Sequence, residues 1–139
     1  MHIDSIQWSR WMSVGIQELD DDHRVLVEIV NKLSTDSSRN SPDVIEAILD
    51  ELIHYTKDHF AREEEYMQRA NYPTFTAHKA LHDALTRQVE NYRARFHASR
   101  DTIPGDEVFD FCADWLGKHI LKEDTRFGEY ATGPGVAAQ

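Results

Sequence analysis

The sequence has little of what secreted and membrane proteins usually contain. Its 139 residues include one cysteine, Cys112, so no disulfide can form within the chain. No apolar run approaches the roughly 20 residues that a membrane-spanning helix needs. The N-terminal residues also lack the basic and apolar regions of a signal peptide. We therefore expect no membrane insertion and a cytoplasmic location, with Cys112 acting as a small buried hydrophobe rather than a reactive thiol.

Positive charge is scarce as well. The chain has 15 lysine and arginine residues against 25 aspartate and glutamate residues, which gives a formal net charge of −10. Such a surface is not attracted to the phosphates of nucleic acid or to anionic membranes, so we expect no nucleic-acid partner. The acidic excess favours solubility and is by itself no argument for a metal site.

What the sequence does contain is helical periodicity, interrupted by short polar segments. With 40% hydrophobic residues, the chain can bury the core of one ordinary domain. Apolar residues recur at the spacing of one helix face, and no strand pattern competes. The pattern predicts an extended N-terminal arm at 1–18, helices at about 19–34, 41–70, 73–98 and 104–129, and a frayed tail at 130–139.

Several residues mark the expected helix ends. Ser41 is a favourable N-cap, and Pro42 suits the first helical position. Pro73 disfavours helix at the residue before it, so the helix that precedes it should end there. Because the loops are short, neighbouring helices should be antiparallel. The prediction is an all-α, up-down-up-down four-helix bundle, with Trp8 and Trp11 of the arm covering apolar surface.

Five of the eight histidines fall on the inner stripes of these helices. His59 and Glu63 are four residues apart, as are His78 and His82, so each pair lies on one helix face, one turn apart. A single histidine on an apolar stripe is more often a hydrogen-bonded core residue. Five clustered imidazoles without a metal would leave many buried nitrogens without partners. The other two histidines of the predicted cluster are His23 and His119, whereas His2, His54 and His97 match no pattern and are expected not to bind metal.

The acidic residue that accompanies His119 is ambiguous on spacing alone. Asp124 follows by five residues, which on a regular helix, at about 100° per residue, places it about 140° away. Glu123, four residues on, is the ordinary helical candidate. Asp124 could face the cluster if the helix widens into a π-bulge, or if it approaches from another side. Imidazoles and carboxylates without thiolate suit iron, manganese, zinc or copper, and the set is large enough for two ions that share carboxylates.

The chain resembles the hemerythrins, specifically the bacterial single-domain members. The matching motifs run through nearly the whole sequence and fill all seven ligand positions of that family. They are Gly15-Ile16, Asp20-Asp-Asp-His23, His59-Phe-Ala-Arg-Glu63-Glu64, Tyr72-Pro73, His78-Lys-Ala-Leu-His82 and Trp115-Leu-Gly-Lys-His119-Ile120-Leu-Lys-Glu-Asp124.

This resemblance chooses Asp124 over Glu123 and names the metal as iron. It implies reversible O2 binding at a non-haem di-iron centre, for oxygen storage, delivery or scavenging, with no catalytic residues. One iron would have three histidines and the other two, so the second is one ligand short and is where O2 binds. The implied ligands are His78, His82 and His119 for one iron, His23 and His59 for the other, and Glu63, Asp124 and an oxo or hydroxo group as bridges.

Apolar residues beside the ligands are expected to line the O2 pocket and to keep out water and protons. They are Leu26, Phe60, Trp115 and Leu121. Asp22 departs from the glutamine that the family often has before its first histidine. One interpretation is that Asp22 belongs to an acidic cluster at the helix start. The other is that Asp22 or Asp20 accepts a hydrogen bond from a ligand imidazole.

Three other functions compete with the oxygen carrier. A di-iron oxidase, peroxidase or nitric-oxide-handling enzyme is the first, but ferritin-like oxidases use two Glu-x-x-His motifs and further glutamates, unlike this set. A stand-alone O2 sensor that acts through an unknown protein partner is the second. Metal storage is the third, and a closed two-ion site argues against it. We expect a monomer, with a dimer as the alternative.

Overall fold

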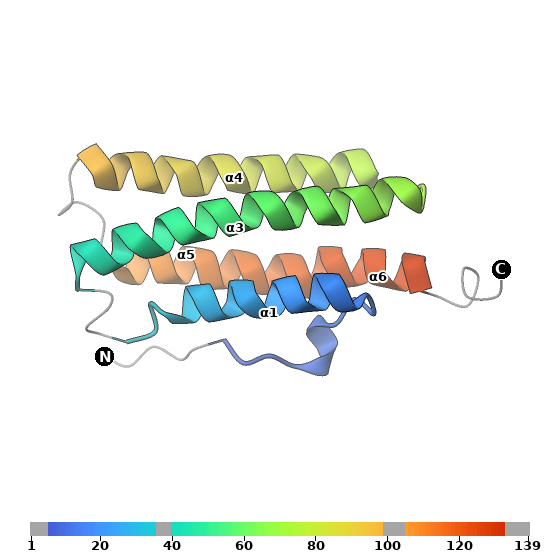
Figure 1. Cartoon of the computed structure of the whole chain (residues 1–139), viewed down its shortest axis with the longest axis horizontal. Helices are drawn as coiled ribbons and strands as arrows, with labels where there is room; N and C mark the ends of the chain where they lie inside the picture. The colour runs from blue at the N-terminus through green and yellow to red at the C-terminus, as the bar shows by residue number, and fades with distance from the viewer. Residues whose placement is uncertain (1–5, 36–39, 99–104, 133–139) are drawn as a thin grey trace.

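The predicted helical bundle is confirmed by the computed structural model, which describes residues 6–35, 40–98 and 105–132. Four long helical stretches lie side by side, each antiparallel to the one before it (Figure 1). No strand occurs within these described ranges. The elements are α1 (Gln17–Asn31), α3 (Pro42–Arg69), α4 (Phe75–Ala98), and a last stretch made of α5 (Gly105–Lys118), the π-helix η2 (His119–Asp124) and α6 (Thr125–Thr132), preceded in the arm by the 3-10 turn η1 (Arg10–Met12).

The ends of α3 follow from local chemistry. At its start, the Ser41 side chain accepts a hydrogen bond from the backbone N–H of Val44, and Pro42 takes the first helical position as predicted. At its end, Asn71 has a positive φ of 54°. The N–H of Tyr72 then donates to the carbonyl of Met67, as in a left-handed helix cap. The chain thereby reverses before α4, which begins two residues later than expected.

The N-terminal arm lies along α1, as Figure 1 shows. Hydrogen bonds tie its two ends to this helix: the Asn31 amide pairs with the backbone of Ile6, and Asp20 accepts from the N–H of Val14 at 2.8 Å. Trp8 is half-buried under the Arg24 guanidinium, but Trp11 is 69% exposed. The expectation that both tryptophans cover the bundle was wrong for Trp11, because the 3-10 turn directs its neighbour Met12 inward instead.

The arm meets α6 in a close backbone contact at Gly128. A Cβ added there would lie 2.3 Å from the carbonyl oxygen of Val14, so only glycine permits this approach. Gly15, the residue after Val14, has a positive φ of 78°. The first helix accordingly begins at Gln17, two residues before its predicted start, and ends at Asn31 rather than near residue 34.

Apolar residues form two separate clusters along the bundle. The larger contains Leu26, Leu49 and Phe60 among many others, and the smaller consists of Val14, Leu19, Met67, Tyr72 and Phe127. In sequence, the candidate ligands fall between members of the two clusters on each helix, as His23 does between Leu19 and Leu26. A buried polar layer therefore separates the two parts of the core.

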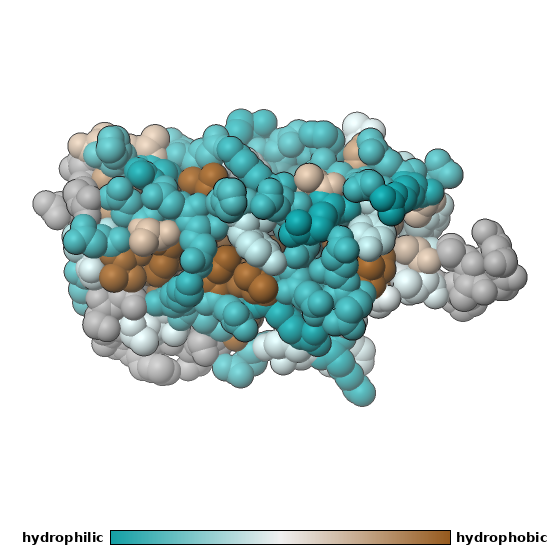
Figure 2. Space-filling view, in the orientation of Figure 1, coloured by the Kyte–Doolittle hydropathy of each residue, from teal (hydrophilic) through white to brown (hydrophobic). Residues whose placement is uncertain are grey.

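The outer surface agrees with the composition. Its face in Figure 2 is mostly hydrophilic, with hydrophobic residues gathered in a band along the middle of the molecule. None of the described helices is both long and apolar enough to span a membrane. The predicted frayed tail lies outside the described residues from 133 onward, whereas 130–132 complete α6.

Candidate metal centre

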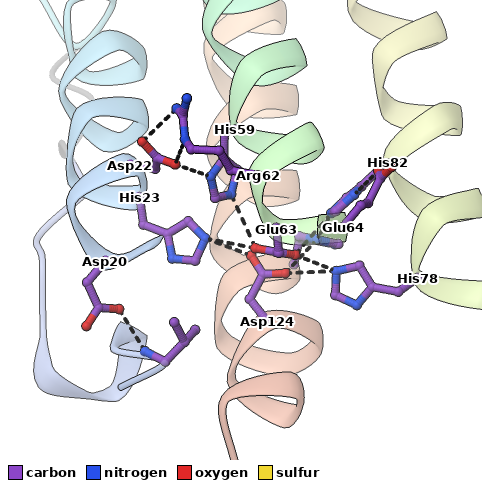
Figure 3. A network of polar contacts seen from close by, with 12 residues as sticks. Asp20, Asp22, His23, His59, Arg62, Glu63, Glu64, His78, His82 and Asp124 are labelled. Carbon is purple, nitrogen blue, oxygen red and sulfur yellow. Dashed lines mark hydrogen bonds and ion pairs between the residues drawn. The ribbon is translucent and has the colours of Figure 1, made fainter. Parts of the chain in front are cut away.

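All seven residues predicted as ligands are buried and converge in the polar layer, and Figure 3 labels all of them except His119. Their nitrogen and oxygen atoms form two groups, and within each group the atoms lie within 4.8 Å of one another. The two carboxylates belong to both groups. One group is Glu63, His78, His82, His119 and Asp124, and the other is His23, His59, Glu63 and Asp124.

Glu63 lies between the groups and uses a different oxygen toward each. Its Oε1 is 2.8 Å from Nε2 of His78 and 3.3 Å from Nε2 of His82. Its Oε2 is 3.3 Å from Nε2 of His59 and 3.5 Å from Nε2 of His23. A carboxylate in this position can serve two metal ions at once.

Asp124 is placed in the same way. Its Oδ1 lies 2.9 Å from Nε2 of His119 and 3.0 Å from Nε2 of His78, while its Oδ2 lies 3.0 Å from Nε2 of His23. The two carboxylates thus form a pair between the two histidine groups.

The π-helix η2 explains why Asp124, and not Glu123, reaches this position. In a π turn the backbone hydrogen bond spans five residues, so residues five apart lie one turn apart. The N–H of Thr125 donates to the carbonyl of Ile120, five residues earlier. His119 and Asp124 stand at the two ends of this segment and face the same point, whereas Glu123 is half-buried and lines a surface groove. Of the two alternatives left open for Asp124, the structure has the π-bulge.

Charge within the cluster shifts the pKa values of both residue types. Burial lowers the pKa of His23, but the adjacent carboxylates of Asp124 and Glu63 outweigh it and raise the value to about 10. The same opposition raises the pKa of His78 to about 9. Burial raises the pKa of Glu63, but the surrounding imidazoles hold it well below its usual range. The carboxylates are therefore ionised, as metal binding requires.

Several buried atoms of the cluster have no hydrogen-bond partner within the described part of the chain. All of them except the outer nitrogen Nδ1 of His23 lie within 3.5 Å of another atom of the cluster. Buried polar atoms normally have partners, so this is the pattern expected of metal ligands. A set of imidazole nitrogens and carboxylate oxygens fits two first-row transition-metal ions. The atoms are Nδ1 and Nε2 of His23, both Oε of Glu63, Nε2 of His78 and Oδ1 of Asp124.

Comparison with known proteins identifies the family. The family model described as "Hemerythrin HHE cation binding domain" matches residues 14–131. The chain belongs to the hemerythrin family. Bacteriohemerythrin of Stenotrophomonas maltophilia is 34% identical over 122 residues, which cover 88% of this chain and 78% of that protein. A hemerythrin from Sipunculus nudus is 32% identical over 124 residues, which cover 89% and 92%.

Solved hemerythrin structures agree with the fold. The wild-type crystal structure has a TM-score of 0.79 and 34% identity, with 88% of this chain and 95% of that chain covered. A leucine-to-alanine variant of hemerythrin has a TM-score of 0.81 and 32% identity, with 94% and 98% covered. The resemblance stated from the sequence motifs is thereby confirmed.

One carboxylate outside the seven supports a histidine in each group of this hemerythrin. Asp22 Oδ2 lies 2.9 Å from Nδ1 of His59, and Glu64 Oε2 lies 2.9 Å from Nδ1 of His82. Of the two roles considered for Asp22, the structure has the hydrogen bond to an imidazole. Asp20 does not take this role, since it holds the N-terminal arm. Sequence reasoning did not assign Glu64, although it follows Glu63 directly in the motif.

Aromatic rings lie flat against two of the histidines. Phe60 stacks on His82 with ring centroids 3.9 Å apart and planes at 4°, and Trp115 stacks on His119 at 4.8 Å and 9°. Leu26 is buried in the larger core cluster. Apolar and aromatic side chains thus lie beside the cluster, whereas the side chain of Leu121 lies outside the described residues.

The remaining histidines are apart from the centre. His54 and His97 are exposed, and the nearest carboxylate to His54 is its helical neighbour Asp58 at 3.9 Å. His2 lies outside the described residues. The buried thiol of Cys112 has its pKa raised to about 12 by burial, which makes it unreactive.

Proposed function

We propose that this protein binds O2 reversibly at a di-iron centre held by the seven converging side chains, for oxygen storage, delivery or scavenging. The observation that carries the proposal is the unequal division of histidines between two groups that share both carboxylates. Membership of the hemerythrin family supports iron as the metal. Neither group contains a thiolate, which agrees with this choice.

Each residue has a specific task in this proposal. His78, His82 and His119 would hold one iron, which with Glu63 and Asp124 would have five protein ligands. The other iron would have four, from His23, His59 and the same carboxylates. An ion that prefers six ligands therefore has more room for O2 at the second position. Two ferrous ions held there and bridged by an oxo or hydroxo group would supply the electrons that reversible O2 binding needs.

The surrounding residues protect this chemistry from water. All seven ligands are buried, and Leu26 and Phe60 belong to the dry core beside them. Phe60 lies between the groups, with its ring centroid 5.8 Å from that of His59 and stacked on His82. Apolar walls would keep water and protons away from the O2 site, which would slow irreversible oxidation of the iron. We propose Leu26, Phe60 and Trp115 as the pocket walls.

We further propose that the protein is a binding protein and not a di-iron oxidase, peroxidase or nitric-oxide-handling enzyme. The ligand set is rich in neutral imidazoles and has only two carboxylates. Ferritin-like oxidases instead take Glu-x-x-His from two helices and further glutamates. A monomeric state and a cytoplasmic location stay predictions from the sequence.

A cycle of oxygenation tests this function. Iron-loaded protein is reduced without air, exposed to O2 and then returned to an O2-free atmosphere, while its visible absorption is followed. A carrier gives spectra that cycle several times without hydrogen peroxide in solution. Stoichiometric peroxide, or turnover of an added substrate, would overturn the carrier and favour the oxidase. Iron analysis before the cycle establishes whether each chain holds both ions.

A further inference from the structure

Asp22 is a buried carboxylate with four hydrogen bonds, and it connects α1 to α3. Its Oδ2 accepts from Nδ1 of His59 at 2.9 Å and from Nε of Arg62 at 2.8 Å. Its Oδ1 accepts from Nη2 of Arg62 at 2.9 Å and from the hydroxyl of Tyr55 at 3.0 Å. Figure 3 shows the carboxylate between Arg62 and His59, on the side of the imidazole away from Glu63.

These contacts leave Asp22 no freedom to rotate. A carboxylate has about four lone-pair sites, and here all of them are used. Arg62 makes a bidentate pair with the carboxylate of Asp22, and its positive charge offsets the cost of burying the negative charge of Asp22. We call the three residues Asp22, Arg62 and Tyr55 the Asp22 clamp.

The clamp determines the tautomer and orientation of His59. An ionised carboxylate only accepts hydrogen bonds, so Nδ1 of His59 must carry a proton, and in the neutral ring that binds metal Nε2 then presents its lone pair. That Nε2 faces Oε2 of Glu63 at 3.3 Å, inside the two-histidine group. A ligand held in this way binds metal more tightly, since neither tautomer nor ring angle has to change on binding.

The other histidine of this group has no such support. Nδ1 of His23 is buried and lacks a hydrogen-bond partner within the described residues. His59 is therefore the one histidine of the pair whose outer nitrogen is held. In the three-histidine group, the corresponding contact is that of Glu64 with His82. Since the two-histidine position has fewer protein ligands, it depends more on the one that is positioned.

We propose that the Asp22 clamp is the positioning device of the two-histidine metal position and sets its affinity for the second metal ion. Asp22 acts through His59 and does not itself bind metal. The identity of the metal as iron, and its use in O2 binding, rest on the function proposed above. The positioning role can be measured with any divalent ion that suits the site.

Asp22→Asn is the most informative variant. An asparagine has one acceptor oxygen, and its NH2 group would face donors of Arg62 or the N–H of His59. The amide cannot accept from both Arg62 and His59, so His59 loses its fixed tautomer. Removal of such an outer partner weakens metal binding by about 10–100-fold.

Metal-free protein is titrated with Co²⁺ under anaerobic conditions, and the visible spectrum resolves the two equivalents. For Asp22→Asn we expect the first equivalent to bind as in the unchanged protein and the second about 10–100-fold more weakly. Asp21→Asn is the matched control, because Asp21 is exposed on the same helix and contacts Gln17 and Arg24 but none of the seven ligands. Glu64→Gln should weaken the other equivalent.

A second measurement does not involve metal. Nitrogen-15 NMR of the metal-free protein, at a pH high enough for His59 to be neutral, should show its Nδ1–H form in the unchanged chain and a different tautomer mixture in Asp22→Asn. If Asp22→Asn does not fold, Arg62→Gln replaces it, since this change keeps the carboxylate of Asp22 and removes both hydrogen bonds from the guanidinium. Co²⁺ binding by the folded variant that matches the unchanged protein at both equivalents would overturn the clamp, as would equal weakening of both equivalents.

The outcomes separate this inference from the proposed function. A protein that cycles O2 while Asp22→Asn binds two Co²⁺ ions normally contradicts the clamp alone. A protein that binds two Co²⁺ ions, loses the second in Asp22→Asn and does not cycle O2 contradicts the carrier and supports the clamp.

Discussion

The two halves of the buried centre are supported by different physical means. Around His59 the support is ionic, since Asp22 is held by Arg62 and Tyr55. Around His82 and His119 it is largely aromatic, because Phe60 and Trp115 lie flat on the two imidazoles, and the Glu64 carboxylate adds one contact at Nδ1 of His82. The half with fewer histidines has the charged clamp, whereas the half with more histidines is packed by rings.

The shared carboxylates connect these halves, so the largest effect is expected from Glu63→Ala. This change removes the oxygens that face four histidines and should cost at least one of the two irons per chain together with reversible O2 binding. Iron analysis and the oxygenated spectrum measure the result. Glu65→Ala is the control, because Glu65 is exposed on the same helix and pairs with Arg69. Two irons with an unchanged spectrum would refute the bridging role of Glu63.

Removal of the ring on His82 tests the aromatic half. Phe60→Ala should lower the free energy of unfolding by about 3–4 kcal/mol, because a buried phenylalanine leaves a cavity. The iron held by three histidines should also be lost faster to a chelator. Urea unfolding and chelator kinetics provide these values. Phe111→Ala, which removes a ring that packs on Tyr92, should leave the chelator kinetics unchanged. Equal iron loss in both variants would mean that the stack on His82 has no specific role.

Both halves contain histidines whose protonation stabilises the metal-free protein. The pKa is about 10 for His23 and about 9 for His78, both above the usual 6.5. Their stabilising contribution is therefore complete below about pH 6.5 and is lost as the pH rises through 9 and 10. We expect the urea midpoint of metal-free protein to fall between pH 7 and pH 10. Metal-loaded protein should not show this loss, since metal replaces the protons. A flat profile without metal would contradict the charge pairing.

The smallest effect is expected at the edge of the ionic half. Tyr55→Phe removes one of the four hydrogen bonds to Asp22 and should cost about 1 kcal/mol of folding free energy, because the tyrosine is only partly buried. Binding of the second Co²⁺ should weaken only a few-fold, since Arg62 still holds the carboxylate. Tyr66→Phe is a control on the same helix. An effect as large as that of Asp22→Asn would place the main support at Tyr55 instead of Arg62.

Local spacing predicted much of the centre. His59 with Glu63, and His78 with His82, are i,i+4 pairs, and their geometry depends on little beyond a regular helix. The same holds for the start of α3 at Ser41 and Pro42, where the cap is local. Asp124 is different, because a regular helix turns it away from His119. Motif resemblance selected it, and η2 provides the geometry.

The errors and omissions arise where distant segments meet. Trp11 was expected to cover the bundle, but the turn of the arm exposes it and buries Met12. The partners of Asp22 are 33, 37 and 40 residues away, so no local pattern could reveal them. Arg62 lies three residues after His59 on the same helix, yet this spacing means little until α1 brings Asp22 alongside.

The sequence by itself determined the helices, the bundle and six of the seven converging residues, because helical periodicity is a property of neighbours in the chain. Resemblance to a family added the seventh and the metal. Only the tertiary structure decided that Glu63 and Asp124 each direct one oxygen toward one histidine group and the other oxygen toward the second group. It also decided that Asp22 faces His59. These arrangements depend on the rotation and register of packed helices, which are determined by the whole core.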